Sequence, residues 1–169
     1  MDVLNAQKVE QFIYNSLNIA AEGVEVFSRD KTVMGQELDI YIPEKNYAIE
    51  PGAWFWHQTK VERDREKRRK CQEQGINLMI IYDSCPPECF VDDIRCYSYN
   101  LSSEDDYHTL KEIVKEICEK LDFRYELLSN KWNEIEDIAR KNCKITTTEE
   151  FIQRLKVINP QITIIGKYR

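Results

Sequence analysis

The sequence predicts an α/β protein in which helices flank a mixed β-sheet that starts with a three-stranded antiparallel meander. Segments of helical and of strand periodicity alternate along the first 122 residues, as they do in layered α/β folds. Three of the strand-like segments follow one another through short turns, which is typical of antiparallel neighbours. A later segment, residues 77–83, is almost entirely apolar, as a strand covered on both faces would be.

The first half of the chain predicts one helix and the meander. Residues 5–19 place apolar side chains at helical spacing, namely Val9, Phe12, Ile13 and Leu17. Residues 24–30, 37–43 and 47–50 follow as strands, with a tight turn at 44–46. Alternation in the second strand predicts two faces, Leu38, Ile40 and Ile42 on one and Glu37, Asp39 and Tyr41 on the other.

The second half predicts two more helices and two more strands. A long helix is expected over residues 58–74, and Gly75 is a natural stop for it. The apolar strand 77–83 follows, and a further strand is expected at 95–100. Residues 102–121 begin with serines and acids and continue at helical period, which predicts a capped helix.

The character of the chain changes after Leu121. Residues 126–142 predict another helix, TTTEEFIQRLKVI a short helix with a threonine cap, and QITIIGKYR a strand. We therefore expect one domain in residues 1–122 and a helical extension in 123–169. A strand that stops at the last residue predicts either that the native protein continues past Arg169 or that the tail docks at an edge of the sheet.

Composition favours a cytoplasmic protein with a packed core. Hydrophobic residues make up 42% of the 169 residues and charged residues 32%. No apolar run approaches the roughly 20 residues that a membrane span needs. The first residues, MDVLNAQKVEQF, lack the basic start and apolar run of a signal peptide. Membrane partners are therefore not expected.

Charge is unevenly distributed along the chain. The net charge is −6, but residues 60–70 hold seven Lys/Arg against three acids, and residues 104–122 are acidic. A phosphate backbone responds to the local field, so an acidic protein can carry a basic binding face. The plainer interpretation of the basic run is a solvated helix face.

Six cysteines are present, and without a secretory signal they are expected to be reduced thiols. The closest pair, Cys85 and Cys89, has a spacing that some zinc sites use. A structural zinc needs four ligands, and no second Cys/His pair lies nearby at suitable spacing. Ordinary cysteines in a turn are the favoured interpretation.

Asp39 and Glu50 are the centre of the functional prediction. They lie on adjacent antiparallel strands joined by a short turn, so side chains on one face can converge. Two nearby carboxylates repel each other unless a cation is present, and their hard oxygens suit Mg²⁺ or Mn²⁺. A metal there can activate water and stabilise charge on a phosphate. The alternative is two acids on the solvent face of a hairpin.

The residues after Glu50 add chemistry near the same strand end. His57 can move protons, and Lys67 can polarise water or a phosphoryl oxygen, with Asp64 three residues before it. The alternatives are a capping or packing role for His57 and a salt-bridged helix surface for Asp64 and Lys67. The aromatic cluster 54–56 is more typical of a core than of a base-stacking platform.

These residues lie in a stretch that resembles a known family. GQELDIYIPEKNYAIEPGAWFWH, followed by Asp64-x-x-Lys67 and by KCQEQGINLMIIYDS, resembles the nuclease domain of a restriction-endonuclease-like, or PD-(D/E)xK, family. That domain is often attached to zinc-ribbon repeats and is similar to very-short-patch repair and homing endonucleases. The family's pattern reads E-L-D-I-Y-I-P, A-I-E-Y-D-G, W-H, D-x-x-K and C-x-x-x-G-I-x-L-I-x-I. The resemblance covers about residues 5–120.

The resemblance implies a restriction-endonuclease-like fold and hydrolysis of phosphodiester bonds with Mg²⁺ or Mn²⁺. The residues that the match assigns are Asp39, Glu50 and Glu37 for the metal, and Asp39, Glu50, Glu10, His57, Asp64 and Lys67 for catalysis. The chain departs from the family at Gly52, where the family has an acid or amide and the broader fold usually has lysine. Lys67 is the best candidate for the displaced lysine. The tail resembles the lead-in to a zinc-ribbon module.

Two functions follow as hypotheses. The first is a metal-dependent endonuclease acting on DNA; the alternative is a catalytically impaired nuclease-fold module that binds nucleic acid or a protein partner. The residues expected to contact the nucleic-acid backbone are Lys60, Arg63, Arg65, Arg68, Arg69 and Lys70. A homodimer is compatible with either hypothesis.

Overall fold

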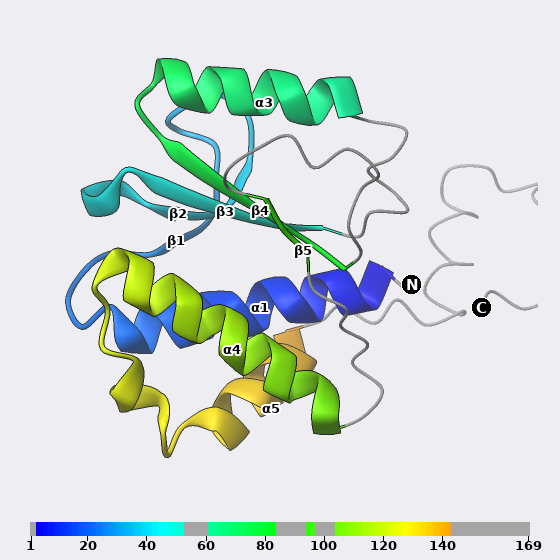
Figure 1. The fold of residues 1–169 in the computed structure, drawn as a ribbon, viewed down its shortest axis with the longest axis vertical. Coiled ribbons are helices and arrows are strands. Elements are labelled where there is room, and N and C mark those ends of the chain that lie inside the picture. The colour runs from blue at the N-terminus through cyan, green and yellow to red at the C-terminus, as the bar shows by residue number, and fades with distance from the viewer. Residues whose placement is uncertain (1–2, 53–60, 84–93, 97–103, 143–169) are drawn as a thin grey trace, which may run out of the picture.

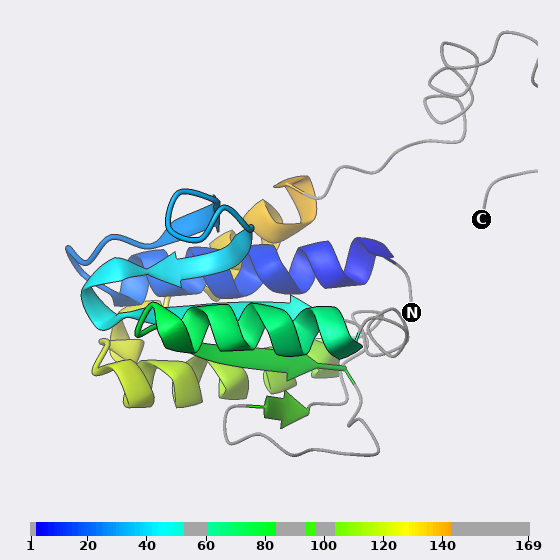
Figure 2. The same cartoon turned by 90° about the horizontal axis from the view of Figure 1, so that it is seen from above.

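The computed structural model describes residues 3–52, 61–83, 94–96 and 104–142 of the 169-residue chain. Its helices and strands follow in the order α1 (Val3–Ala20), β1 (Phe27–Asp30), β2 (Leu38–Ile42), η1 (Pro43–Lys45), β3 (Tyr47–Gly52), α3 (Val61–Glu73), β4 (Asn77–Tyr82), β5 (Ile94–Cys96), α4 (Glu104–Leu121), η2 (Tyr125–Leu128) and α5 (Trp132–Asn142). Helix α3 covers one face of the sheet, and α1 and α4 cover the other (Figures 1 and 2).

The sheet has five strands in the order β1-β2-β3-β4-β5. Strands β1, β2 and β3 pair antiparallel, whereas β4 runs parallel to β3 and β5 parallel to β4. The predicted meander and the mixed α/β class are therefore confirmed. None of the helices in the described ranges is long and apolar enough to cross a membrane.

The first strand begins at Phe27 and is therefore shorter than the predicted 24–30. Strand β2 ends at Ile42, and the next residue is Pro43, which has no N–H to donate to a ladder. In the β1–β2 register, residues 24 and 25 would lie opposite Glu44 and Pro43, which belong to η1 and offer no strand to pair with. Asn46 closes the turn into β3 with a left-handed backbone, φ 46°, and its N–H donates to the Pro43 carbonyl.

Two apolar clusters hold the layers together. The larger one joins α1, α4 and one face of the sheet, and it includes Phe12, Ile13, Ile40, Ile42 and Ile49. The smaller one lies under α3. Leu38 belongs to the smaller cluster, so the prediction that it shares a face with Ile40 and Ile42 was wrong. Leu38 is the first residue of β2 and pairs only with Asp30 of β1, with no partner on β3. Its side-chain direction is therefore less fixed than that of a residue paired on both sides.

Residues after Leu121 pack on the same core as α1. Leu128, Ile135 and Ala139 are buried members of the larger cluster. The Trp132 ring stacks on Phe12 of α1, with centroids 5.9 Å apart and planes at 9°. The predicted helix 126–142 is instead a 3₁₀ turn followed by α5. Ser129 explains the break, because its Oγ donates to the Glu126 carbonyl and so competes with helical bonding.

Several predicted segments lie outside the described residues. They are positions 58–60 of the helix before Gly75, positions 97–100 of the fifth strand, positions 102–103 of the helix that follows it, the pair Cys85 and Cys89, the aromatic cluster 54–56, and the tail 143–169. The predicted division at residue 122 stays a prediction.

Candidate active site

A polar pocket of about 220 Å³ opens between α3 and the ends of β2 and β3. Its lining brings together residues from the β1–β2 connection, both strands and the helix: Gln36, Glu37, Asp39, Glu50, Arg63, Asp64 and Lys67. Five of the residues singled out for catalysis or metal binding lie in this set, together with one of those expected to contact nucleic acid. Segments 11 and 17 residues apart in sequence thus meet at one place.

The β2–β3 register explains why the two central carboxylates meet. Ile40 pairs with Ile49, so the antiparallel ladder places Asp39 opposite Glu50. One Glu50 oxygen, Oε1, accepts a hydrogen bond from the Asp39 backbone N–H at 3.0 Å. The carboxylates are therefore held by the backbone of neighbouring strands, which is a rigid support for a site.

Lys67 of α3 joins this pair from above the sheet. Its Nζ donates to the second oxygen of Glu50, Oε2, at 2.5 Å. The two side chains are only 17% and 14% exposed, so this ion pair is shielded from water. The alternative interpretation of Lys67, a surface salt bridge within the helix, does not describe this geometry. Below it, Leu78 and Ile80 form an apolar floor beside Glu50 and Asp64.

Both carboxyl groups hold their protons more tightly than usual. Burial, and then the charge of Glu50, raise the pKa of Asp39 well above its ordinary value. Burial also raises the pKa of Glu50, whereas Lys67 and the Asp39 N–H oppose that rise. Among the described residues, none donates a hydrogen bond to the Asp39 carboxylate. Asp39 is thus the group in this pocket whose negative charge is least compensated.

Other acids surround the central pair. Tyr82 on β4 donates from its hydroxyl to Asp64 Oδ2 at 3.3 Å. The charge of Asp64 adds to the rise in the pKa of Glu50. Glu37 pairs with Lys31 at 3.2 Å, and its side chain is 39% exposed. Glu37 and Asp64 therefore line the pocket beside the Asp39–Glu50 pair and add to its negative charge.

Glu10 lies on α1, below the sheet, and is buried. Its two carboxylate oxygens accept hydrogen bonds from Arg29 of β1, at 2.9 Å from Nε and 3.3 Å from Nη2. Its charge still raises the pKa of Asp39. The structure therefore places Glu10 near the pair but engages its carboxylate with an arginine.

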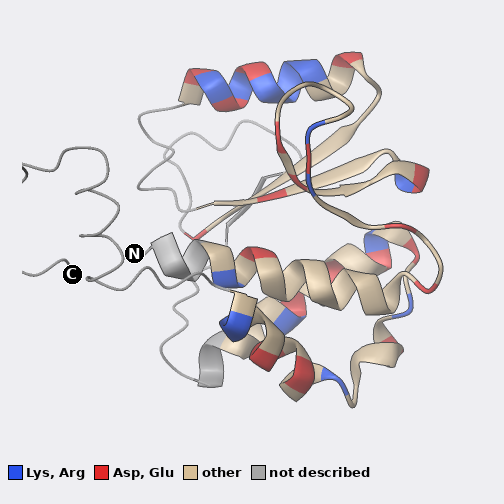
Figure 3. Cartoon of the chain, turned by 180° about the vertical axis from the view of Figure 1, so that it is seen from behind, with Lys and Arg blue, Asp and Glu red and all other residues tan. Residues whose placement is uncertain are grey.

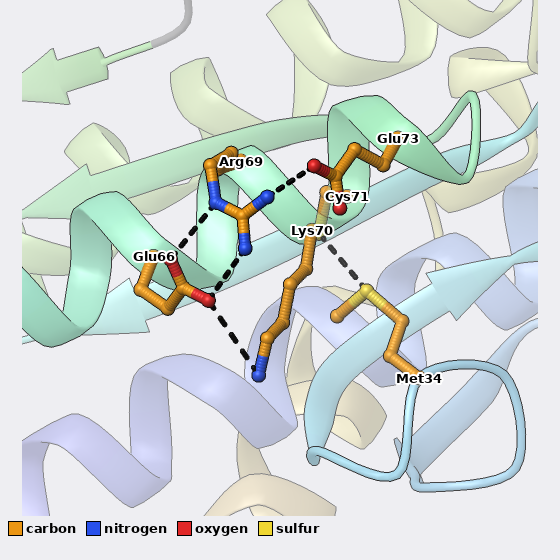
Figure 4. Close-up of polar contacts among 6 residues, drawn as sticks. All are labelled: Met34, Glu66, Arg69, Lys70, Cys71 and Glu73. Carbon is orange, nitrogen blue, oxygen red and sulfur yellow. Dashed lines mark hydrogen bonds and ion pairs between the residues drawn. The ribbon is translucent and has the colours of Figure 1, made fainter.

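The outer face of α3 carries both charge signs (Figure 3). Arg65 pairs with Glu62 at 2.7 Å, and Arg69 pairs with Glu66 at 2.8 Å and also with Glu73. Lys70 lies 3.8 Å from Glu66 (Figure 4). Three of the residues expected to contact a nucleic-acid backbone are thus neutralised by acids one turn away.

Arg63 differs from these residues. It is exposed, it lines the pocket, and no ion pair joins it to any acid within the described ranges. Arg68 is partly buried, while His57 and Lys60 fall outside the described residues. Arg63 is therefore the described α3 arginine best placed to meet an anion that enters the pocket.

Two cysteines, one on α3 and one on α4, are buried in the described structure. Cys71 on α3 and Cys118 on α4 are buried free thiols, and burial raises the pKa of Cys71 to about 11. The Cys71 thiol contacts Met34 Sδ at 3.6 Å, which attaches the β1–β2 connection to α3 (Figure 4). The same connection supplies Gln36 to the pocket.

Three residues near the pocket were missed by sequence reasoning: Gln36, Arg29 and Tyr82. Tyr82 had a usable signal, because it lies two residues after Ile80, the register partner of Glu50, on the same face of β4. Gln36 and Arg29 had none, since their positions depend on the course of the β1–β2 connection.

Among the described residues, no group of three or more His, Cys, Asp or Glu side chains is arranged to hold a metal ion. Comparison of the chain with protein-family models, with curated proteins and with solved structures finds no match. The chemistry of the pocket therefore carries the functional argument.

Proposed function

We propose that this chain is a restriction-endonuclease-like domain that hydrolyses phosphodiester bonds in DNA with Mg²⁺ or Mn²⁺. The observation that carries the proposal is the shared pocket of Asp39, Glu50 and Lys67, with Arg63 at its rim. An anionic base suits a divalent cation, and a cationic rim suits a phosphate. The resemblance in the stretch around Glu50 supports the same family.

The donor set fits such an ion. Two hard carboxylates face one pocket, and the Asp39 carboxylate accepts no hydrogen bond from the described residues. Mg²⁺ usually keeps several waters and is held by one or two carboxylates together with substrate phosphates, so a third protein ligand is not required. Asp39 and Glu50 would hold the ion, which would supply a Lewis acid that offsets charge developing on the phosphate.

The chain's own groups have separate tasks in this proposal. Lys67 Nζ lies 2.5 Å from Glu50, so an ammonium group is available where an attacking water or a phosphoryl oxygen would be oriented. Arg63 offers a planar fork that binds phosphate oxygens in a bidentate way. The Asp39 N–H fixes Glu50 at its other oxygen, which limits its rotation.

One observation favours the alternative of a binding module without chemistry. The Lys67–Glu50 ion pair offsets one carboxylate charge from within the protein, and in the family resemblance Gly52 of β3 matches the position where the broader fold usually has lysine. A site that is neutralised internally can persist after catalysis is lost. The nuclease would hydrolyse DNA in the presence of the metal, whereas the binding module would bind DNA without hydrolysing it.

A plasmid-nicking assay tests the proposal directly. The wild-type chain is expected to convert supercoiled plasmid to open-circular or linear DNA in Mg²⁺ or Mn²⁺, and to leave it intact in EDTA. A Glu50→Gln preparation, purified in the same way, controls for contaminating nucleases and is expected to be inactive. If wild type shows no turnover of DNA with either metal, the nuclease proposal fails; salt-sensitive binding without turnover then identifies the alternative.

Arg63→Ala and Arg69→Ala form a matched pair on α3. Each removes one positive charge from an exposed arginine, but only Arg63 lines the pocket, whereas Arg69 pairs with Glu66 and Glu73. We expect Arg63→Ala to weaken DNA binding roughly tenfold, as loss of a charge-assisted hydrogen bond does. Arg69→Ala is expected to stay within about twofold of wild type. Equal losses in an anisotropy titration would instead indicate a general charge effect.

A further inference from the structure

Arg29 is the feature of the described structure that the proposed chemistry leaves unused. It lies on β1, the strand at the end of the sheet order. Ser28 pairs with Ile40 and Asp30 with Leu38, so Arg29 lies between the two ladder pairs that flank Asp39 of β2. The hydrogen bond to Glu10 and, to a lesser extent, the charges of Glu37 and Asp39 raise the pKa of Arg29, and the latter two residues line the pocket. An arginine therefore lies on the strand next to the one that carries Asp39.

The Arg29 side chain is held in place from below. Glu10, whose side chain is 9% exposed, accepts hydrogen bonds from Nε and Nη2. A guanidinium has five N–H donors, so about three remain, and no other described residue accepts them. The side chain is 51% exposed. A fixed guanidinium with free donors facing water is preorganised to bind an anion.

The backbone at Arg29 has an unusual conformation for this residue type. Its φ is 54°, in the left-handed region that costs an L-residue roughly 1 kcal/mol. Residues in such conformations persist where the surroundings over-determine them. Here the hydrogen bonds to the buried carboxylate of Glu10 and the ladder pairs of Ser28 and Asp30 on either side do so. A simple surface ion pair would require neither the strain nor the burial of its acid.

We propose that Arg29, held by Glu10, binds a phosphate of the nucleic-acid backbone next to the one that enters the pocket. The substrate class rests on the proposed function. Arg63 on α3 and Arg29 on β1 then lie on opposite sides of Asp39, and the backbone crosses the site from the helix to the edge strand. Glu10 acts through Arg29 as a positioning residue.

The test measures binding, with an endpoint separate from cleavage. A fluorescein-labelled duplex oligonucleotide is titrated by anisotropy over a salt series, with Ca²⁺ in place of Mg²⁺ and the integrity of the duplex checked on a gel. The main variant is Arg29→Gly with Glu10→Gln. Glycine suits the positive φ, and the double change leaves neither a buried unpaired carboxylate nor an altered net charge. Arg29→Lys keeps a partner for Glu10 but loses the planar fork.

We expect the double variant to bind roughly tenfold more weakly. Its salt slope is expected to be shallower by about one, as for one lost phosphate contact. Arg29→Lys is expected to fall between the double variant and wild type. Arg124→Ala is the matched control, because Arg124 is 52% exposed and also paired, with Glu22 and Glu126 at the far end of α1. It is expected to bind as wild type does. Thermal melting of each variant verifies folding.

Each outcome separates this inference from the nuclease proposal. If the double variant binds like wild type with the same salt slope, Arg29 is only structural, whether or not the chain cuts DNA. If it binds more weakly but wild type never cuts, the phosphate contact stands and the nuclease proposal fails. Absence of wild-type binding at low salt overturns the assignment of Arg29.

Discussion

Asp39→Asn is expected to abolish metal-dependent cleavage and, at the same time, to make the protein more stable at neutral pH. The loss of activity should be at least about a hundredfold, because it removes one of two carboxylates proposed to hold the ion. The gain in stability has another origin. Burial and Glu50 raise the pKa of Asp39, so its ionised form is costly in the folded chain.

The sign of the pH dependence follows from linkage. Because the folded pKa of Asp39 lies above the unfolded pKa, the folded state binds more protons between these two values. The contribution of Asp39 to stability is present below the unfolded pKa and is lost as pH rises through the folded pKa. The amide that replaces this carboxyl group in the variant does not titrate. The melting temperatures of variant and wild type should therefore converge near pH 4 and separate at higher pH.

A series of thermal melts in EDTA from acid to neutral pH measures this effect. We expect Asp39→Asn to melt roughly 2–4 °C above wild type at neutral pH, which corresponds to about 1 kcal/mol for a chain of this size. Asp137→Asn is the control, since Asp137 is 62% exposed on α5. Added Mg²⁺ should raise the melting temperature of wild type and not that of Asp39→Asn. A variant less stable than wild type at neutral pH would show that the folded state stabilises the ionised carboxylate.

The part of the site that depends on local pattern could be predicted from the sequence. A short turn between two alternating strands determines the register, and the register places Asp39 opposite Glu50. The apolar strand before Asp83 predicts a covered central position, and β4 lies between β3 and β5. These features depend on residues close together in sequence, so periodicity and turn length are enough to predict them.

The basic helix shows what counting charges misses. Residues 60–70 have an excess of Lys and Arg, which predicted a binding face. Glu62 and Arg65, like Glu66 and Arg69, are three positions apart, and this spacing predicts ion pairs along one face of a helix. Arg63 stands apart only because α3 is rotated so that this residue lines the pocket. Rotation of a helix on a sheet depends on tertiary packing, which a single sequence does not specify.

The contacts of Arg29 could not be predicted, for a similar reason. Nineteen positions separate Arg29 from Glu10, and they meet because α1 packs under the sheet. No periodicity relates a mid-helix glutamate to a strand residue with positive φ. The same holds for Lys67 and Glu50, 17 positions apart, whose contact requires α3 to cross above β3.

Lys67→Met is expected to lower kcat for DNA cleavage by at least about a hundredfold and, at the same time, to increase the response of the protein to Mg²⁺. The lysine would contribute charge stabilisation that is made only in the transition state, so its loss lowers kcat. It is also the cation that Glu50 contacts in this structure. Without it, two carboxylates face the pocket uncompensated, and a divalent ion binds them without displacing an ammonium group.

Melting and kinetics together distinguish these two effects. In EDTA, Lys67→Met should be less stable than wild type by about 1–3 kcal/mol, because the buried carboxylate of Glu50 loses its cationic partner and keeps only the hydrogen bond from the Asp39 N–H. In Mg²⁺ the variant should regain more stability than wild type does, and half-saturation should need less metal. Lys70→Met is the matched control on the same helix, because Lys70 lies 3.8 Å from an exposed glutamate. A wild-type kcat in Lys67→Met would show that Lys67 is a structural partner of Glu50 alone. An unchanged Mg²⁺ response would show that the ion does not compete with the Lys67 ammonium group for Glu50 Oε2.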